Sequence, residues 1–192
     1  DWQFATNFTD EKFLKKAKKA GLEPAAASLL YQRGVQTEEA LQEFLEPSLD
    51  QLHNPYDLHD MERAVERIRS AIENYEQILI YGDYDADGMT SASIVKEALE
   101  QLGAECQVYL PNRFTDGYGP NSSVYKYFIE NQDISLIITV DNGVSGLEAI
   151  ELAQSLGVDV IVTDHHSMPE ELPNAYAIVH PEHSGADYPF KH

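Results

Sequence analysis

The sequence predicts an α/β fold, a Rossmann-like parallel sheet with helices on both faces, preceded by a helical N-terminal segment. From residue 77 onward, short apolar runs alternate with segments whose apolar residues repeat at helical spacing. The short runs are almost continuously apolar, as in strands buried on both faces of a parallel sheet. Before residue 76 the apolar residues follow helical spacing alone. We therefore expect a helical N-terminal segment over 1–75 and an α/β domain over 76–192.

The N-terminal segment carries helix start and stop signals. Pro24 suits the first turn of a helix that ends before Gly34. Thr37 can cap a second helix and Asp60 a third. The stretch 46–59 between these two helices has little periodicity, so we expect a connecting loop there.

The α/β domain is expected to alternate strands with helices. The predicted strands are 78–81, 106–110, 136–140, 158–163 and 177–179. The predicted helices are 90–102, 121–129 and 147–156. In parallel sheets of this kind, ligands bind outside the carboxyl ends of the strands, so the residues that follow each strand matter most.

Composition narrows the class of protein. The chain has 192 residues, with 13 Lys and Arg against 33 Asp and Glu and a net charge of −20, which argues against binding nucleic acid through overall charge. Five of the eight lysines lie within 12–19, where they are expected to form one solvated helix face. Cys106, the single cysteine, rules out a disulfide within the chain and a zinc site of several thiolates, and fits a reducing cytoplasm.

The ends and the hydropathy of the sequence lead to two further expectations. No apolar run approaches the roughly 20 residues that span a bilayer, so no membrane segment is expected. The chain begins at Asp1 without an initiator methionine and has no basic signal-peptide region, and it ends at His192. We expect it to be a fragment.

Acidic residues and histidines follow three of the predicted strands. Asp83-Tyr84-Asp85-Ala86-Asp87-Gly88 follows the first strand, Asp141-Asn142-Gly143 the third, and Asp164-His165-His166 the fourth. Because parallel strands end at one edge, five aspartates would repel one another there unless a cation offset their charge. Mixed carboxylate and imidazole ligands suit Mn²⁺ or Mg²⁺, and carboxylates can bridge two ions about 3.5–4 Å apart. The sequence predicts a catalytic metal centre.

Two other kinds of metal site match part of the sequence. Asp-x-Asp-x-Asp-Gly also begins an EF-hand calcium loop, but counting from Asp83 the twelfth position, which needs a bidentate Glu, is Ile94, and a strand precedes the loop. His180 and His183 form a weaker alternative pair of ligands, since Pro181 between them indicates a turn.

These motifs, in this order, resemble the first three motifs of the DHH phosphoesterase superfamily, which is named after Asp164-His165-His166. Within it they are most similar to the bacterial RecJ family. The segments that carry this similarity are Gly82 to Gly88, Asn112 to Gly119, Arg33-Gly34, and Phe44-Leu45-Glu46-Pro47. The resemblance covers nearly the whole chain.

The resemblance implies a metal-dependent exodeoxyribonuclease of DNA repair and recombination. Such an enzyme hydrolyses single-stranded DNA from the 5′ end, releases mononucleotides and uses Mn²⁺ or Mg²⁺, as two ions. The expected partners are single-stranded DNA with a 5′ end, a helicase and a single-strand-binding protein.

The resemblance also implies roles for individual residues. Metal ligands are expected at Asp83, Asp85, Asp87, Asp141, which bridges, and His165. Asp164 and His166 are expected at the catalytic step, with His166 facing the scissile phosphate.

Substrate contacts are expected beside the metal centre. Arg113 offers a guanidinium that suits phosphate, and Tyr118 a ring that can stack on a base. Ser91 is close enough in sequence to the first acidic loop to touch a phosphate, although a local structural role is the simpler interpretation. Plain surface and packing roles for Arg113 and Tyr118 remain open from sequence alone.

The chain ends before the fourth motif and the second domain of the family, so the metal site is expected to be incomplete and the 192 residues alone weakly active or inactive. Two rival functions remain at this stage. One is another DHH enzyme, a phosphodiesterase or pyrophosphatase, and the other is an inactive DHH-like scaffold that binds DNA or protein. The helical N-terminal segment and the loop from Arg113 to Gly119 argue against the first, and the intact aspartates and histidines argue against the second.

Overall fold

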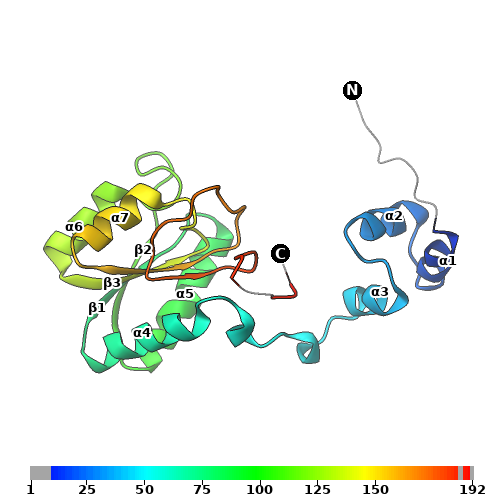
Figure 1. Cartoon of the computed structure of the whole chain (residues 1–192), viewed down its shortest axis with the longest axis horizontal. Helices are drawn as coiled ribbons and strands as arrows, with labels where there is room; N and C mark the ends of the chain where they lie inside the picture. Colours follow the sequence, from blue (N-terminus) through cyan, green and yellow to red (C-terminus); the bar gives the residue numbers. More distant parts are fainter. Residues whose placement is uncertain (1–9, 186–187, 191–192) are drawn as a thin grey trace. The chain divides into compact units, whose positions relative to one another are not determined.

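A computed structural model of the chain describes residues 10–185 and 188–190, which form two compact units (Figure 1). The units are Asp1–Leu52 and His53–His192, and each is described separately. No helix in the described part combines the length and the apolar character needed to cross a membrane.

The first unit is a small helical cluster made of α1 (Glu11–Lys19), α2 (Pro24–Gln32) and α3 (Glu38–Leu45). Pro24 occupies the first turn of α2, and the hydroxyl of Thr37 accepts a hydrogen bond from Ala40 N at the start of α3, as predicted. Its buried core consists of Phe13, Ala17, Ala27 and Leu41. Two short 3₁₀ helices, Leu49–Gln51 and Pro55–Asp57, interrupt the predicted connecting loop.

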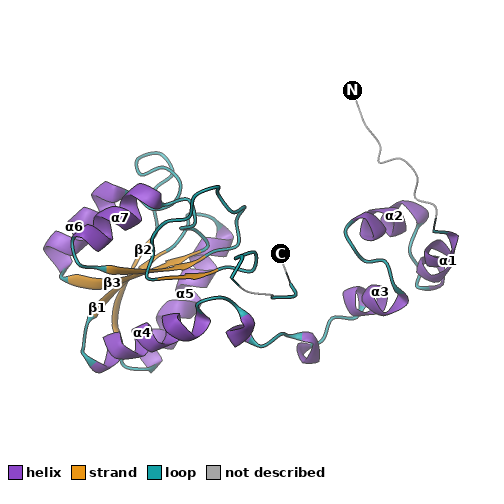
Figure 2. Cartoon of the chain, viewed as in Figure 1, coloured by secondary structure: helices purple, strands orange, loops and turns teal. Residues whose placement is uncertain are grey.

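The second unit contains the predicted five-stranded parallel sheet (Figure 2). Its strands are β1 (Gln77–Tyr81), β2 (Glu105–Tyr109), β3 (Ile134–Val140), β4 (Asp159–Thr163) and β5 (Ala177–Val179). The order across the sheet is β2-β1-β3-β4-β5, and every pair is parallel. The predicted α/β fold class is confirmed.

Helices cover both faces of the sheet, which is why its central strands are largely apolar. The helices of this unit are α4 (Met61–Glu73), α5 (Ala86–Gln101), α6 (Ser122–Gln132) and α7 (Leu147–Ser155). α6 and α7 pack with Leu79, Ile137 and Val160 on one face, whereas α4 and α5 pack with Ile78 and Ile138 on the other.

The helix α4 belongs to the same compact unit as the sheet. Asp60 precedes it in a left-handed conformation, with φ of 58°. Asp60 occupies the N-cap position of α4, as predicted, but its carboxylate makes no capping hydrogen bond. The carboxylate accepts a hydrogen bond from Ile178 N at 3.0 Å instead, and so joins the start of α4 to β5. The compact unit therefore begins at His53, upstream of residue 76, where the sequence pattern changes to strands.

Candidate metal centre

The acidic motifs after β1, β3 and β4 meet at the carboxyl edge of the sheet. Two overlapping groups of side chains could each hold a metal ion, one made of Asp83, Asp85 and Asp141 and the other of Asp141, His165 and His166. Within each group the ligand atoms lie within 4.8 Å of one another. Asp141 belongs to both groups, which is the position that a bridging carboxylate requires.

Asp141 is held by an unusual turn at the end of β3. It has φ of 62°, a left-handed conformation that aspartate and asparagine tolerate better than most residues. The side chain of Asn142 donates to the carbonyls of Tyr81 at 3.2 Å and Val140 at 2.9 Å, and so joins the ends of β1 and β3. A side chain at Gly143 would meet Thr139 Oγ1 at 2.5 Å, so glycine is needed to close the turn.

The loop after β1 presents three aspartates in different surroundings. Asp83 is buried and accepts a hydrogen bond from Tyr84 N at 2.6 Å. Asp85 caps α5 by accepting from the main-chain N–H groups of Asp87 and Gly88 through Oδ1, which starts the helix at Ala86 rather than at the predicted residue 90. Asp87 is exposed, and its carboxylate lies 3.9 Å from His165 Nε2.

Asp164 fixes the turn that carries both histidines. Its Oδ2 accepts from Val144 N at 3.0 Å, and its Oδ1 accepts from the main-chain N–H groups of His165 at 2.7 Å and His166 at 3.0 Å. Burial raises the pKa of Asp164, but these hydrogen bonds outweigh it and leave the pKa below its ordinary value. Because the side chain is 1% exposed, Asp164 positions the histidines from behind.

The two histidines face different partners. His165 Nε2 lies 2.9 Å from Asp141 Oδ1. His166 Nδ1 lies 2.8 Å from Asp164 Oδ1, so this nitrogen donates to the carboxylate and Nε2 is left for a ligand. Burial lowers the pKa of His166, but the bond to Asp164 and the nearby aspartates raise it more, so that the net pKa is raised.

The electrostatics of the cluster favour a bound cation. Burial, followed by the charges of Asp87 and Asp85, raises the pKa of Asp141 despite its contact with His165. A divalent ion among these oxygens would offset the repulsion between the carboxylates. Mn²⁺ readily binds carboxylate oxygens together with an imidazole nitrogen, and Mg²⁺ binds the carboxylate oxygens. The donor set fits the predicted metal.

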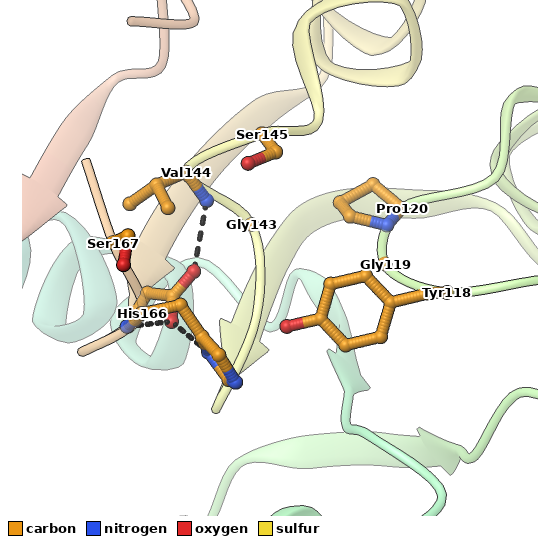
Figure 3. A pocket seen from close by; sticks show the side chains of 9 residues that line it. Tyr118, Gly119, Pro120, Gly143, Val144, Ser145, His166 and Ser167 are labelled. Atoms are coloured by element: carbon orange, nitrogen blue, oxygen red, sulfur yellow. Dashed lines mark hydrogen bonds and ion pairs between the residues drawn. The ribbon is translucent and has the colours of Figure 1, made fainter. Parts of the chain in front are cut away.

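A pocket beside His166 contains one of the predicted substrate residues. Tyr118, Pro120, Val144, Asp164 and His166 are among the residues that line it (Figure 3). The rings of Tyr118 and His166 lie 5.7 Å apart in an edge-to-face arrangement. The pocket therefore joins an aromatic surface to the histidine end of the metal centre.

The loop that carries Tyr118 is tied down by two tyrosines of the sheet. Tyr109 donates its hydroxyl to Asp116 at 2.7 Å, and the hydroxyl of Tyr81 donates to the carbonyl of Gly119 at 3.0 Å. Asp116 also accepts from Asn112 N at 2.7 Å. These hydrogen bonds hold the loop against the sheet.

Arg113 and Ser91 approach the site from other directions. The guanidinium of Arg113 lies 4.5 Å from the centre of the Tyr84 ring and is exposed. Ser91, on α5, lines a second pocket together with Asp87, Asp141 and His165. The structure thus brings Ser91 to the metal centre and attaches Arg113 to its first loop through Tyr84.

His180 and His183 do not form the alternative metal pair. His180 is fully buried, and its ring nitrogens bond to the carbonyl of His166 at 2.8 Å and to Glu182 N at 3.0 Å. With both nitrogens occupied by the main chain, His180 has no ligand atom to offer.

The roles of two residues of the site were not predicted from the sequence. Tyr84 supports Arg113, and Asn142 joins the ends of two strands. Asn142 had a signal, because Asp-Asn-Gly is a turn sequence. Tyr84 had none, because its partner Arg113 lies 29 residues away.

The chain is similar to known proteins. Residues 77–187 match the family model described as "DHH family, N-terminal domain". The single-stranded-DNA-specific exonuclease RecJ of Bacillus subtilis is 45% identical over 168 residues, which cover 88% of this chain and 21% of that protein. The chain thus spans about a fifth of the length of this relative.

Solved structures show the same fold. A crystal structure of exonuclease RecJ bound to manganese superposes with a TM-score of 0.64 at 31% identity, over 69% of this chain and 34% of that one. RecJ from Thermus thermophilus in complex with Mn²⁺ superposes with a TM-score of 0.62 at 27% identity, over 93% of this chain and 24% of that one.

Proposed function

This chain belongs to the DHH family, and from that premise we propose that it carries most of the metal centre of a single-stranded-DNA-specific exonuclease of DNA repair and recombination. The proposed reaction is hydrolysis of phosphodiester bonds from the 5′ end, with release of mononucleotides. The observation that carries the proposal is the convergence of Asp83, Asp85, Asp141, His165 and His166 at one edge of the sheet. The manganese bound by RecJ relatives of the same fold supports it.

In the proposed mechanism, Asp83, Asp85, Asp87 and His165 would hold the Mn²⁺ or Mg²⁺ ions, expected to be two, and Asp141 would be the carboxylate that the two share. Bound ions of this kind activate water at neutral pH and offset charge on the phosphoryl oxygens. Asp164 keeps His165 and His166 in place through its buried hydrogen bonds. No nucleophilic side chain is needed.

The residues around the ions would bind the DNA. His166 in its protonated imidazolium form would donate from Nε2 to a phosphate oxygen while Nδ1 donates to Asp164, and its raised pKa favours this form. Tyr118 stacks on a base in the pocket beside His166. Arg113 and Ser91 bind neighbouring phosphates from the two sides of the first acidic loop.

The proposal extends to the cell. A single-strand exonuclease needs a 5′ end exposed by strand separation, which a helicase supplies, and a single-strand-binding protein would hold the product of that step. We place this activity in the cytoplasm, where the one cysteine, Cys106, would stay reduced.

A degradation assay tests the proposal, made with the longest natural polypeptide that contains this sequence. Single- and double-stranded DNA labelled at the 5′ end are incubated with Mn²⁺ or with a chelator. We expect labelled mononucleotides from single strands alone, lost with the chelator and in Asp141→Asn.

The control variant is Asp133→Asn, because Asp133 is an exposed aspartate that also has a positive φ, of 54°. It should leave cleavage unchanged. DNA that is bound but uncut with every metal would overturn the exonuclease and favour an inactive scaffold, and cleavage of short oligonucleotides or pyrophosphate alone would favour another DHH enzyme.

A further inference from the structure

The lysines of α1 form a cationic face in an acidic protein. Lys12, Lys15, Lys16 and Lys19 follow the i, i+3, i+4, i+7 spacing that places residues on one side of a helix. Phe13 and Ala17 are buried on the other side. The lysines themselves are exposed, so this face, which we call the lysine face, is open on the first unit.

Three of the four lysines of the lysine face, Lys12, Lys15 and Lys19, differ from the other lysines of the described chain because they form no ion pair with a described residue. Lys96 pairs with Glu100 and Lys126 with Glu130, each four residues further along its helix. On α1, only Lys16 has such a partner, Glu38 of α3, at 2.6 Å. In residues 10–185 and 188–190, no carboxylate forms an ion pair with the remaining lysines of α1, namely Lys12, Lys15, Lys18 and Lys19.

The arrangement places like charges next to one another. Lys12 and Lys16 are four residues apart, as are Lys15 and Lys19, and like charges at this spacing destabilise a helix slightly. The three lysines near its C-terminus interact favourably with the helix dipole, but Lys12 and Lys15 lie outside the last turn. An anionic partner on this face would remove the repulsion.

Charge is divided unequally between the two units. Asp1–Leu52 holds 6 of the 13 cationic residues but only 9 of the 33 acidic ones, so it carries a net charge of −3 and the rest of the chain −17. An extended polyanion would therefore meet much less repulsion on the first unit than on the second.

We propose that the lysine face of α1 binds the phosphate backbone of single-stranded DNA, at a site separate from the metal centre. Exposed lysines bind phosphates through charge, without reading the sequence, and three of the four lysines of this face have no described carboxylate partner to compete with a phosphate. The choice of single-stranded DNA among polyanions rests on the proposed function. The lysine face would hold the strand independently of metal and of cleavage.

The test is fluorescence anisotropy of a labelled oligothymidylate with the whole 192-residue chain, in chelator and at several salt concentrations. The variant is Lys15→Gln with Lys19→Gln. The matched control is Lys96→Gln with Lys126→Gln, which changes the net charge by the same amount. Circular dichroism checks that both variants fold, and the loss of lysine repulsion should leave the α1 variant at least as stable as the parent.

We expect the α1 variant to bind about fivefold more weakly at low salt. The slope of log K against log salt should become shallower by about 1.4, since each phosphate contact on a single strand contributes about 0.7. The control should keep the slope of the parent chain.

Equal weakening in both variants, or an unchanged slope in the α1 variant, would overturn the proposal. Tighter binding of a polyglutamate peptide than of the oligonucleotide would assign the lysine face to an acidic protein instead. Because the chelator silences metal-dependent cleavage, these outcomes are independent of the degradation assay above.

Discussion

At the scale of single residues, the site depends on a glycine at a position that has no room for a side chain. Gly88, in the first turn of α5, packs directly against the main chain of Asp83: an added Cβ would meet Asp83 N at 2.5 Å and Asp83 Cα at 2.6 Å. The glycine thus lets the helix approach the acidic loop closely. The same close approach holds Asp83 at the edge of the sheet.

We expect Gly88→Ala to destabilise the chain, although replacing a helical glycine by alanine usually stabilises a protein. Alanine in place of a helical glycine normally stabilises by roughly 0.5–1 kcal/mol, but overpacking here should cost about 1–3 kcal/mol. Urea unfolding of the chain measures it. Ser93→Ala, at an exposed position of the same helix, is the control and should change little. If Gly88→Ala is more stable than the parent chain, the loop that carries Asp83 can move to accept the added methyl group, which would contradict the prediction.

His183 provides a prediction on pH. Its ring stacks on His59 with 3.8 Å between the ring centres, and Asp60 and His180 also face it. Burial and the neighbouring His59 lower the pKa of His183, so the unfolded chain binds this proton more tightly than the folded chain. The resulting stability is present above the ordinary pKa of about 6.5 and is lost as the pH falls below it.

The measurement is the free energy of unfolding between neutral pH and about pH 5, in the parent chain and in His183→Gln. Between neutral pH and about pH 5, the free energy of unfolding should fall less in His183→Gln than in the parent chain. The difference should be less than about 1 kcal/mol, because the ring of His183 is partly exposed. His53→Gln, at an exposed histidine, serves as the control. An identical pH dependence in His183→Gln and the parent would contradict the assignment.

At the scale of elements, α4 is fastened to the edge of the sheet opposite the metal centre. Arg67 donates to Asp159 at 2.6 Å, at the start of β4, and to Glu76 at 2.6 Å, just before β1. Burial lowers the pKa of Arg67, but the two carboxylates raise it more, so the net pKa is raised. The Arg67 side chain is 13% exposed, so this ion pair is well shielded on the cationic side.

Removal of this cation should loosen the helix from the sheet. Arg67→Met leaves two carboxylates without their partner and should cost about 1–2 kcal/mol of unfolding free energy, since both acids keep some contact with water. Arg69→Met, at an exposed position of α4, should cost little. Equal losses in the two variants would mean that Arg67 contributes no more than a surface arginine.

The elements also show how far sequence reasoning reached. All five strands were predicted within two residues of their observed ends, because near-continuous apolar runs such as 136–140 leave few alternatives. The start of α5 was predicted four residues late, because the capping bond of Asp85 adds a turn that periodicity does not reveal. Asp60 was expected to cap α4, but its partner Ile178 lies 118 residues away.

The candidate site follows the same division. The convergence of Asp83, Asp141 and His165 could be predicted, because parallel strands end at a common edge. The buried hydrogen bonds of Asp164 and the stacking of Arg113 on Tyr84 could not, because they depend on side chains from separate loops. Local sequence predicts the element that carries a residue better than the contacts that the residue makes there.

At the scale of the whole molecule, part of the net charge of −20 is concentrated in one place. Part of it is gathered at the carboxyl edge of the sheet, where Asp83 and Asp141 are buried beside the more exposed Asp85 and Asp87. Uncompensated carboxylates at such a place oppose folding, and bound divalent ions would offset that cost. The metal centre is therefore expected to contribute to stability as well as to chemistry.

The measurement that tests this account most directly is a titration of the chain with Mn²⁺, with free Mn²⁺ counted by its paramagnetic resonance signal. Asp141→Asn keeps a residue that tolerates the positive φ of this position but removes the shared charge, and Asp133→Asn makes the same change at an exposed position. We predict that Asp141→Asn binds Mn²⁺ at least about tenfold more weakly, since even changes behind the ligands cost 10–100-fold. Asp133→Asn should bind as the parent chain does. Equal Mn²⁺ binding by Asp141→Asn and the parent chain would contradict a metal centre built on Asp141.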